Sequence, residues 1–129
     1  MNIYPIITTP EPARCKEFYV ALFGARVLFE AEWYVQLQFD KWEIGFLKPN
    51  PPQRLPVFQH ARPSAGLTLA MEVPDVKKFY LQMTRRKIQT LGKPEKFPSG
   101  EMSFSVMDPA GVVLNFVEHH ASTSEIVEL

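Results

Sequence analysis

Uncharged hydrogen-bonding side chains recur at alternate positions of the predicted strands. In EWYVQLQF the polar row contains Tyr34 and Gln36, opposite an apolar row. Later strands add hydroxyl and amide groups at positions of the same parity: Thr68, Ser103, Ser105 and Asn115. A sheet face in open solvent usually carries Lys and Glu, whereas these groups stand beside small apolar residues. The mixture favours a cavity that orients an organic ligand through a few polar contacts over an ordinary solvent-facing sheet.

Other reactive residues carry weaker signals. Cys15 has no evident partner, so a structural role is favoured over a nucleophilic one. His119 and His120 are adjacent on the chain and would point to opposite faces of a strand, which disfavours a shared metal ion. The basic run 85–87 falls at the end of a predicted helix, where cations suit the helix dipole.

Size and charge exclude several classes of partner. The chain has 129 residues, which fits a single domain over 1–129. Lys plus Arg and Asp plus Glu number 14 each, so no net field recruits nucleic acid or an anionic membrane. The first apolar run is too short for a signal peptide, and no later run reaches membrane-spanning length. A cytoplasmic location is therefore expected.

A proline-rich connector over 49–65 divides the chain into halves of similar pattern, 2–48 and 66–120, followed by a polar tail over 121–129. Each half is predicted to be a βαβββ module, which indicates an internal duplication in an α+β protein. The first module is expected to contain strands at 2–9, 26–30, 33–39 and 42–47 and a helix over 11–23 with Phe18, Ala21 and Leu22 on its inner face. The second is expected to contain strands at 67–73, 87–91, 102–107 and 112–118 and a helix capped by Asp75 that runs to residue 86.

Three passages resemble the vicinal oxygen chelate superfamily of glyoxalases, bleomycin-resistance proteins and extradiol dioxygenases. They are EFYVALFGARVLFEAEWYVQLQFDKWEIGFL, LAMEVPDVKKFYLQM and SFSVMDPAGVVLNFVEH, and the likeness covers residues 3–120. The Asp-Pro-x-Gly turn in the last passage is the most specific local signature. The resemblance implies that the modules form a curved mixed sheet, an open barrel-like cup around the active site, with the helices on its outer face.

The resemblance also locates the metal ligands of metal-dependent members. Their four positions correspond here to Tyr4, Gly45, Thr68 and Asn115, none of which is a carboxylate or an imidazole. A catalytic divalent cation needs three or four such ligands, so neither a metal nor another cofactor is expected. Three residues outside the four positions leave an unorthodox site open: Glu43, Glu72 and His60.

The metal-free, bleomycin-resistance-type members bind ligands without transforming them. The chain is therefore expected to bind a small organic molecule, and sequestration is one use of such binding. Because its net charge is zero, an aromatic or neutral ligand is favoured over a cationic drug. Trp33 and Phe97 are further candidates for ligand contact, beside the polar rows and Tyr4. The alternatives are a metal-dependent lyase, isomerase or dioxygenase, and a scaffold whose cavity is filled by its own side chains. A homodimer follows from the family likeness.

Overall fold

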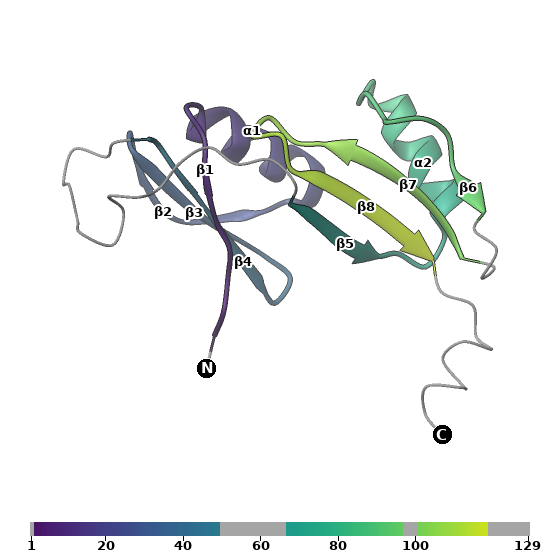
Figure 1. The fold of residues 1–129 in the computed structure, drawn as a ribbon, viewed down its shortest axis with the longest axis horizontal. Helices are drawn as coiled ribbons and strands as arrows, with labels where there is room; N and C mark the ends of the chain where they lie inside the picture. Colours follow the sequence, from purple (N-terminus) through teal and green to yellow (C-terminus); the bar gives the residue numbers. More distant parts are fainter. Residues whose placement is uncertain (1, 50–66, 97–100, 119–129) are drawn as a thin grey trace. The chain divides into compact units, whose positions relative to one another are not determined.

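Two stretches of the chain each fold into a β-α-β-β-β unit in the computed structural model, which describes residues 2–49, 67–96 and 101–118 (Figure 1). The first unit also includes the turn Asp108–Gly111. Its elements are β1 (Ile6–Thr8), α1 (Pro12–Phe23), β2 (Arg26–Ala31), β3 (Tyr34–Phe39) and β4 (Trp42–Leu47). Those of the second are β5 (Thr68–Glu72), α2 (Val76–Arg85), β6 (Glu95–Lys96), β7 (Met102–Met107) and β8 (Val113–Glu118).

Each unit contains its own open, four-stranded mixed sheet. The strand orders are β1-β4-β3-β2 and β5-β8-β7-β6, and in both sheets the strand before the helix pairs in parallel with the last strand of the unit. The α+β class and the two βαβββ modules predicted from sequence are thereby confirmed. The extents of the connector and the tail stay predictions, because almost all of both lies outside the described residues.

Helix α1 covers one face of the first sheet, where it contacts β3 and β4 (Figure 1). Pro12 occupies its first turn, where the missing N–H costs nothing, and Gly24 ends it with φ of 64°. The predicted inner face is only partly right. Leu22 is buried, but Ala21 is exposed and the buried positions are Pro12, Cys15, Tyr19 and Leu22.

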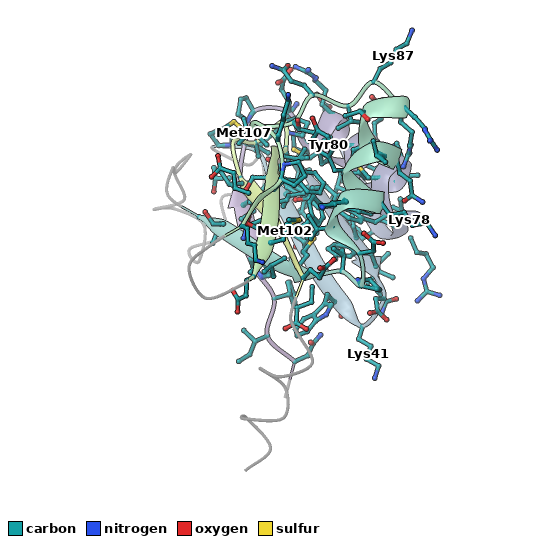
Figure 2. The ribbon with its side chains drawn as sticks, turned by 90° about the vertical axis from the view of Figure 1, so that its right-hand side faces the viewer. Lys41, Lys78, Tyr80, Lys87, Met102 and Met107 are labelled. Carbon is teal, nitrogen blue, oxygen red and sulfur yellow. The ribbon has the colours of Figure 1, made fainter. Side chains whose placement is uncertain are left out.

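Helix α2 covers one face of the second sheet and is capped at its N-terminus as predicted. Asp75 accepts a hydrogen bond from the Lys78 backbone N–H at 3.0 Å, and the Glu118 carboxylate accepts one from Val76 N–H at 2.8 Å. Lys78 on α2 and Lys87 in the turn that follows it point into open space (Figure 2). Within the described residues no helix is long and apolar enough to span a membrane.

The strand predicted at 87–91 is wrong. Lys87 has φ of 59°, a left-handed conformation that closes the end of α2, and its N–H bonds the Thr84 carbonyl at 3.0 Å. The edge strand of this sheet is instead β6, which pairs with β7 through Glu95 and Lys96. Leu91 contributes one ladder hydrogen bond, from its N–H to the Ser105 carbonyl at 2.8 Å.

Cys15 is completely buried, and that burial raises the pKa of its thiol from about 9 to about 12, with a smaller contribution from the Asp108 carboxylate. The thiol is therefore protonated at neutral pH, which supports the structural role over the nucleophilic one.

The same shift predicts alkaline destabilisation. Above pH 9 the unfolded chain loses the thiol proton while the folded chain retains it, so the free energy of unfolding falls as the pH rises towards 12. Between pH 9 and 10, below the ordinary tyrosine pKa, the slope should approach about 1.4 kcal/mol per pH unit. Denaturant titrations of the wild type and Cys15→Ala measure it. The variant should have a shallower slope, which comes from Tyr19 and Tyr34, whose pKa values are also raised by burial. An equal slope in both proteins would contradict the assignment.

Candidate functional site

The polar row of β3 lies on the sheet face away from α1. Val35 and Leu37 are 1% and 0% exposed beneath the helix, while Gln36 alternates with them and faces Gly45 of β4. Phe29 of β2 faces Gln36 from the other side and is half exposed. The strand parity predicted from sequence therefore holds in the first unit.

The phenol of Tyr34 lies across Gly45. The two residues are diagonal neighbours, because Tyr34 pairs with Leu47 and Gln36 with Gly45. A side-chain carbon on Gly45 would overlap the Tyr34 hydroxyl and would lie 2.8 Å from Cζ of its ring. Tyr34 is 9% exposed and is therefore well packed. Glycine at position 45 is what allows the phenol to lie here.

A short hydrogen-bonded chain runs from Tyr34 across this face. The Tyr34 hydroxyl donates to Gln36 Oε1 at 2.6 Å, and Gln36 Nε2 donates to Glu43 Oε1 at 2.7 Å. Asn2 Nδ2 donates to the other carboxylate oxygen of Glu43 at 2.8 Å. The network fixes the orientation of Gln36 and the carboxylate before any ligand arrives, which is the condition for a preorganised polar contact.

Tyr34 serves this network as a neutral donor. Burial, with smaller contributions from the nearby Tyr4 and Glu43, raises the pKa of its hydroxyl to about 12. The phenol therefore keeps its proton throughout the physiological range. Tyr4 belongs to the segment before β1, is 36% exposed and is close enough to influence Tyr34 electrostatically.

Aromatic rings gather beside the network. Tyr34 lies 5.8 Å from Trp33 and 6.3 Å from Phe29, measured between ring centroids, and Phe29 and Trp33 are 6.4 Å apart. Trp33 belongs to the turn before β3 rather than to the strand that the sequence predicted. Exposed ring surface beside fixed polar groups is the combination that an aromatic ligand requires.

The second unit carries a milder polar face. Ser105 and Asn115 are cross-strand partners, and the Ser105 hydroxyl donates to Asn115 Oδ1 at 2.9 Å. Asn115 also pairs with Ala70 of β5, two residues from the exposed Thr68. Ser103 has the same parity but is 5% exposed. This face has small hydroxyl and amide groups among apolar neighbours, as the alternation predicted.

The structure brings together some of the sequence-predicted site residues within each unit. In the first, Tyr34 bonds Gln36 with Trp33 and Tyr4 close by; in the second, Ser105 bonds Asn115. Phe97, His60, His119 and His120 lie outside the described residues. Asn2 was missed, because nothing in its sequence context signals a side chain that reaches residue 43.

The side chains at the four family positions do not fit a divalent metal ion. Tyr4, Gly45, Thr68 and Asn115 offer a phenol, no side chain, a hydroxyl and an amide. Across 2–49, 67–96 and 101–118, no three residues of the His, Cys, Asp and Glu types come together as a ligand set. A register shifted by one residue would have brought Glu118 to the polar face, but Glu118 caps α2 instead.

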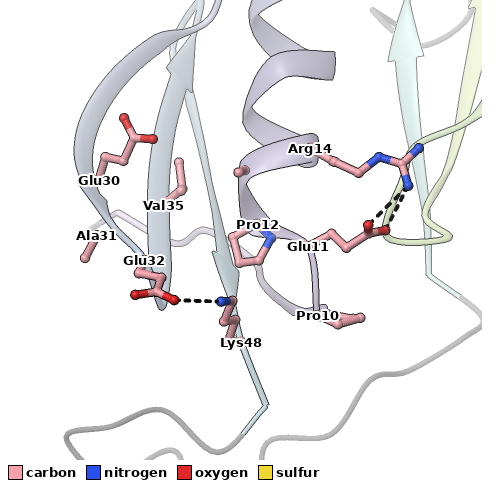
Figure 3. A pocket seen from close by; sticks show the side chains of 10 residues that line it. Pro10, Glu11, Pro12, Arg14, Glu30, Ala31, Glu32, Val35 and Lys48 are labelled. Carbon is pink, nitrogen blue, oxygen red and sulfur yellow. Dashed lines mark hydrogen bonds and ion pairs between the residues drawn. The ribbon is translucent and has the colours of Figure 1, made fainter.

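A groove of about 500 Å³ opens in the first unit between the start of α1 and the β2–β3 turn (Figure 3). It is distinct from the polar face, since Val35 on its floor belongs to the buried row. Its cations are engaged: Arg14 pairs with Glu11 at 3.0 Å and Lys48 with Glu32 at 3.5 Å. The lining residues are Pro10, Glu11, Pro12, Ala13, Arg14, Glu30, Ala31, Glu32, Val35 and Lys48.

Comparison with known proteins places this geometry in a family. The family model described as the Glyoxalase/Bleomycin resistance protein/Dioxygenase superfamily matches residues 4–116. A search of curated proteins gave no match. Among solved structures, a lactoylglutathione lyase from Agrobacterium tumefaciens is 17% identical, with a TM-score of 0.75 and 92% of each chain covered.

Two solved structures of bleomycin-related proteins are also similar. A bleomycin-binding protein complexed with bleomycin is 19% identical with a TM-score of 0.64, and the match covers 93% of this chain and 99% of that one. A bleomycin resistance determinant encoded on the transposon Tn5 is 18% identical with a TM-score of 0.65, covering 93% and 98%. At these identities the likeness establishes the fold alone.

Proposed function

Because this chain belongs to the Glyoxalase/Bleomycin resistance protein/Dioxygenase superfamily, we propose that it binds a small aromatic organic molecule without a metal ion. The observation that carries the proposal is the preorganised network of Tyr34, Gln36 and Glu43 beside the rings of Phe29 and Trp33. The rings supply contact area, and the Gln36 amide and Tyr34 phenol orient the ligand through hydrogen bonds. In the second unit, considered by itself, Thr68, Ser105 and Asn115 are the polar side chains that we propose as ligand contacts.

The chemistry at the four family positions supports binding over metal-assisted catalysis. At Gly45 the Tyr34 phenol fills the space that a metal-ligating side chain would need. A residue at position 45 therefore cannot coordinate a metal ion without displacing a buried ring. The fold likeness to a bleomycin-binding protein supports a ligand-binding role in the same general sense. Sequestration of a toxic compound is one physiological use of such a protein.

The proposal is tested by ligand-induced stabilisation. A ligand that binds only the native state adds about 2.7 kcal/mol to the free energy of unfolding at a concentration of 100 Kd, so its presence raises the unfolding midpoint. We expect hits among flat aromatic antibiotics and metabolites. Gln36→Leu should then weaken binding of any hit about tenfold, because the ligand loses a fixed polar partner.

Trp42→Ala is the matched control. Trp42 is 65% exposed on β4, with the parity of Ile44 rather than that of Gly45, so its loss removes an aromatic from the other face of the same strand. Binding should be unchanged. Failure of every aromatic compound to stabilise the protein would overturn the proposal. Stoichiometric nickel, zinc, iron or manganese in protein purified without an affinity tag would favour a metal-dependent lyase or dioxygenase instead.

Three further expectations accompany the proposal and remain predictions. The protein forms a homodimer, which light scattering on the purified chain measures. It is cytoplasmic, and it binds no nucleic acid.

A further inference from the structure

The Glu43 carboxylate is fixed in place without being neutralised. Each of its oxygens accepts one hydrogen bond from an uncharged amide, Oε1 from Gln36 and Oε2 from Asn2. Within the described part of the chain, no lysine, arginine or histidine nitrogen forms an ion pair with it. An ionised carboxylate has about four acceptor sites, so both oxygens can still accept a donor from a ligand.

Other glutamates of the same unit are held differently. Glu11 pairs with Arg14, Glu30 with Lys16 at 2.6 Å and Glu32 with Lys48. A lysine or arginine offsets the negative charge of the glutamate that it pairs with. The two amides at Glu43 orient its carboxylate but, being uncharged, do not offset its negative charge. The half-buried position of Glu43 strengthens its attraction for a cation relative to that of a carboxylate in open water.

An aromatic side chain lies within electrostatic range of this charge. Glu43 acts electrostatically on the Tyr34 phenol, which is within reach of Tyr4, and Gln36 connects the two through hydrogen bonds. The negative face of an aromatic ring attracts a cation, so rings and a carboxylate together favour one kind of ligand.

We propose that Glu43 selects ligands that carry a protonated nitrogen attached to, or close to, an aromatic ring. This rests on the proposed function and specifies its ligand class. The net charge of zero suggested a neutral ligand. Salt screens charges beyond about 10 Å, so the charges within that distance of the ligand, and not the net charge of the chain, determine which ligand charge is attracted. The cation donates to Glu43 while its ring lies over the Tyr34 side of the face.

Three probes of equal ring size test the proposal by fluorescence titration at pH 7. They are 9-aminoacridine, which is a cation, 9-anthracenemethanol, which is neutral, and 9-anthracenecarboxylate, which is an anion. We expect the cation to bind about tenfold more tightly than the neutral probe, and the anion to bind most weakly. Raising the salt concentration should narrow the difference between cation and neutral probe.

Glu43→Gln keeps the shape but removes the charge. Its carbonyl oxygen can still accept from Gln36 Nε2, and its NH2 group then faces Asn2, whose amide has to turn to present its oxygen. The affinity for the cation should fall about tenfold. The affinity for the neutral probe should stay within about twofold of the wild-type value, and the affinity for the anion should rise. Glu17→Gln is the control, since Glu17 is exposed on α1 and its loss changes the net charge equally. It should leave all three affinities unchanged, and unfolding curves verify that both variants are folded.

The outcomes separate the two proposals. Equal binding of the cation and the neutral probe, or a uniform effect of Glu43→Gln on all three, would overturn the role of Glu43 while leaving aromatic binding intact. Binding by none of the probes, together with an unsuccessful stabilisation screen, would overturn the proposed function, and the role of Glu43 with it.

Discussion

Replacing Tyr19 by phenylalanine is expected to lower the free energy of unfolding by about 2–3 kcal/mol. Tyr19 is completely buried on α1, and its hydroxyl donates to Asp108 Oδ2 at 2.8 Å. Asp108 is 4% exposed, so the substitution removes a donor from a buried carboxylate and leaves that acceptor poorly solvated. Phenylalanine keeps the ring, which packs against Phe18, Phe23, Phe39 and Phe46.

Tyr80→Phe is the matched control for this substitution. Tyr80 occupies the corresponding Phe-Tyr pair on α2, is only partly buried and contacts Phe104 through its ring at 5.3 Å. Its hydroxyl forms no hydrogen bond with a described residue, so the expected loss is below about 0.5 kcal/mol. Urea titrations of both variants measure the difference. Equal losses would mean that the Tyr19–Asp108 bond contributes no more than an ordinary hydroxyl.

Gly45→Ala is expected to cost about 1–3 kcal/mol, because the added methyl group enters space that the Tyr34 phenol occupies. The ring cannot simply rotate away, since its hydroxyl is bonded to Gln36 and it packs at a tilt against Trp33, with the ring centroids 5.8 Å apart. The backbone conformation at Gly45 is not the cause, since its φ is not among the positive values that favour glycine.

A double-mutant cycle isolates the clash. In a Tyr34→Ala background the space above residue 45 is empty, so Gly45→Ala should cost little there, and the coupling energy should exceed about 1 kcal/mol. Chemical denaturation of the four proteins gives the value. Additive effects would show that the phenol does not depend on glycine beneath it.

Much of the fold follows from alternation in the sequence. The polar and apolar rows of β3, β7 and β8 were predictable because a strand has a period of two, and a shift by one residue would have exposed Leu37 or Phe116, both fully buried. The α2 cap was predictable because Asp75 directly precedes an amphipathic run.

Other features depend on contacts that sequence spacing does not encode. The inner face of α1 includes Tyr19, whose buried hydroxyl is explained only by Asp108, 89 residues further along the chain. The strand expected at 87–91 failed because Lys87 adopts a left-handed conformation that no proline or glycine announces. In the candidate site, parity identified Tyr34 and Gln36 as sharing a face, but the reach of Asn2 and the position of Tyr34 over Gly45 depend on side-chain rotamers.

The contact between Tyr34 and Gly45 also limits how this protein could evolve. A larger residue at 45 and a phenol at 34 exclude each other, so a single substitution that introduced an acidic metal ligand at 45 would first have to displace a packed ring. Two coordinated changes would be needed, and the intermediate would be less stable. Among related chains, a bulky residue at the position of Tyr34 should therefore accompany a small residue at the position of Gly45. Chains with bulky residues at both positions should be rare.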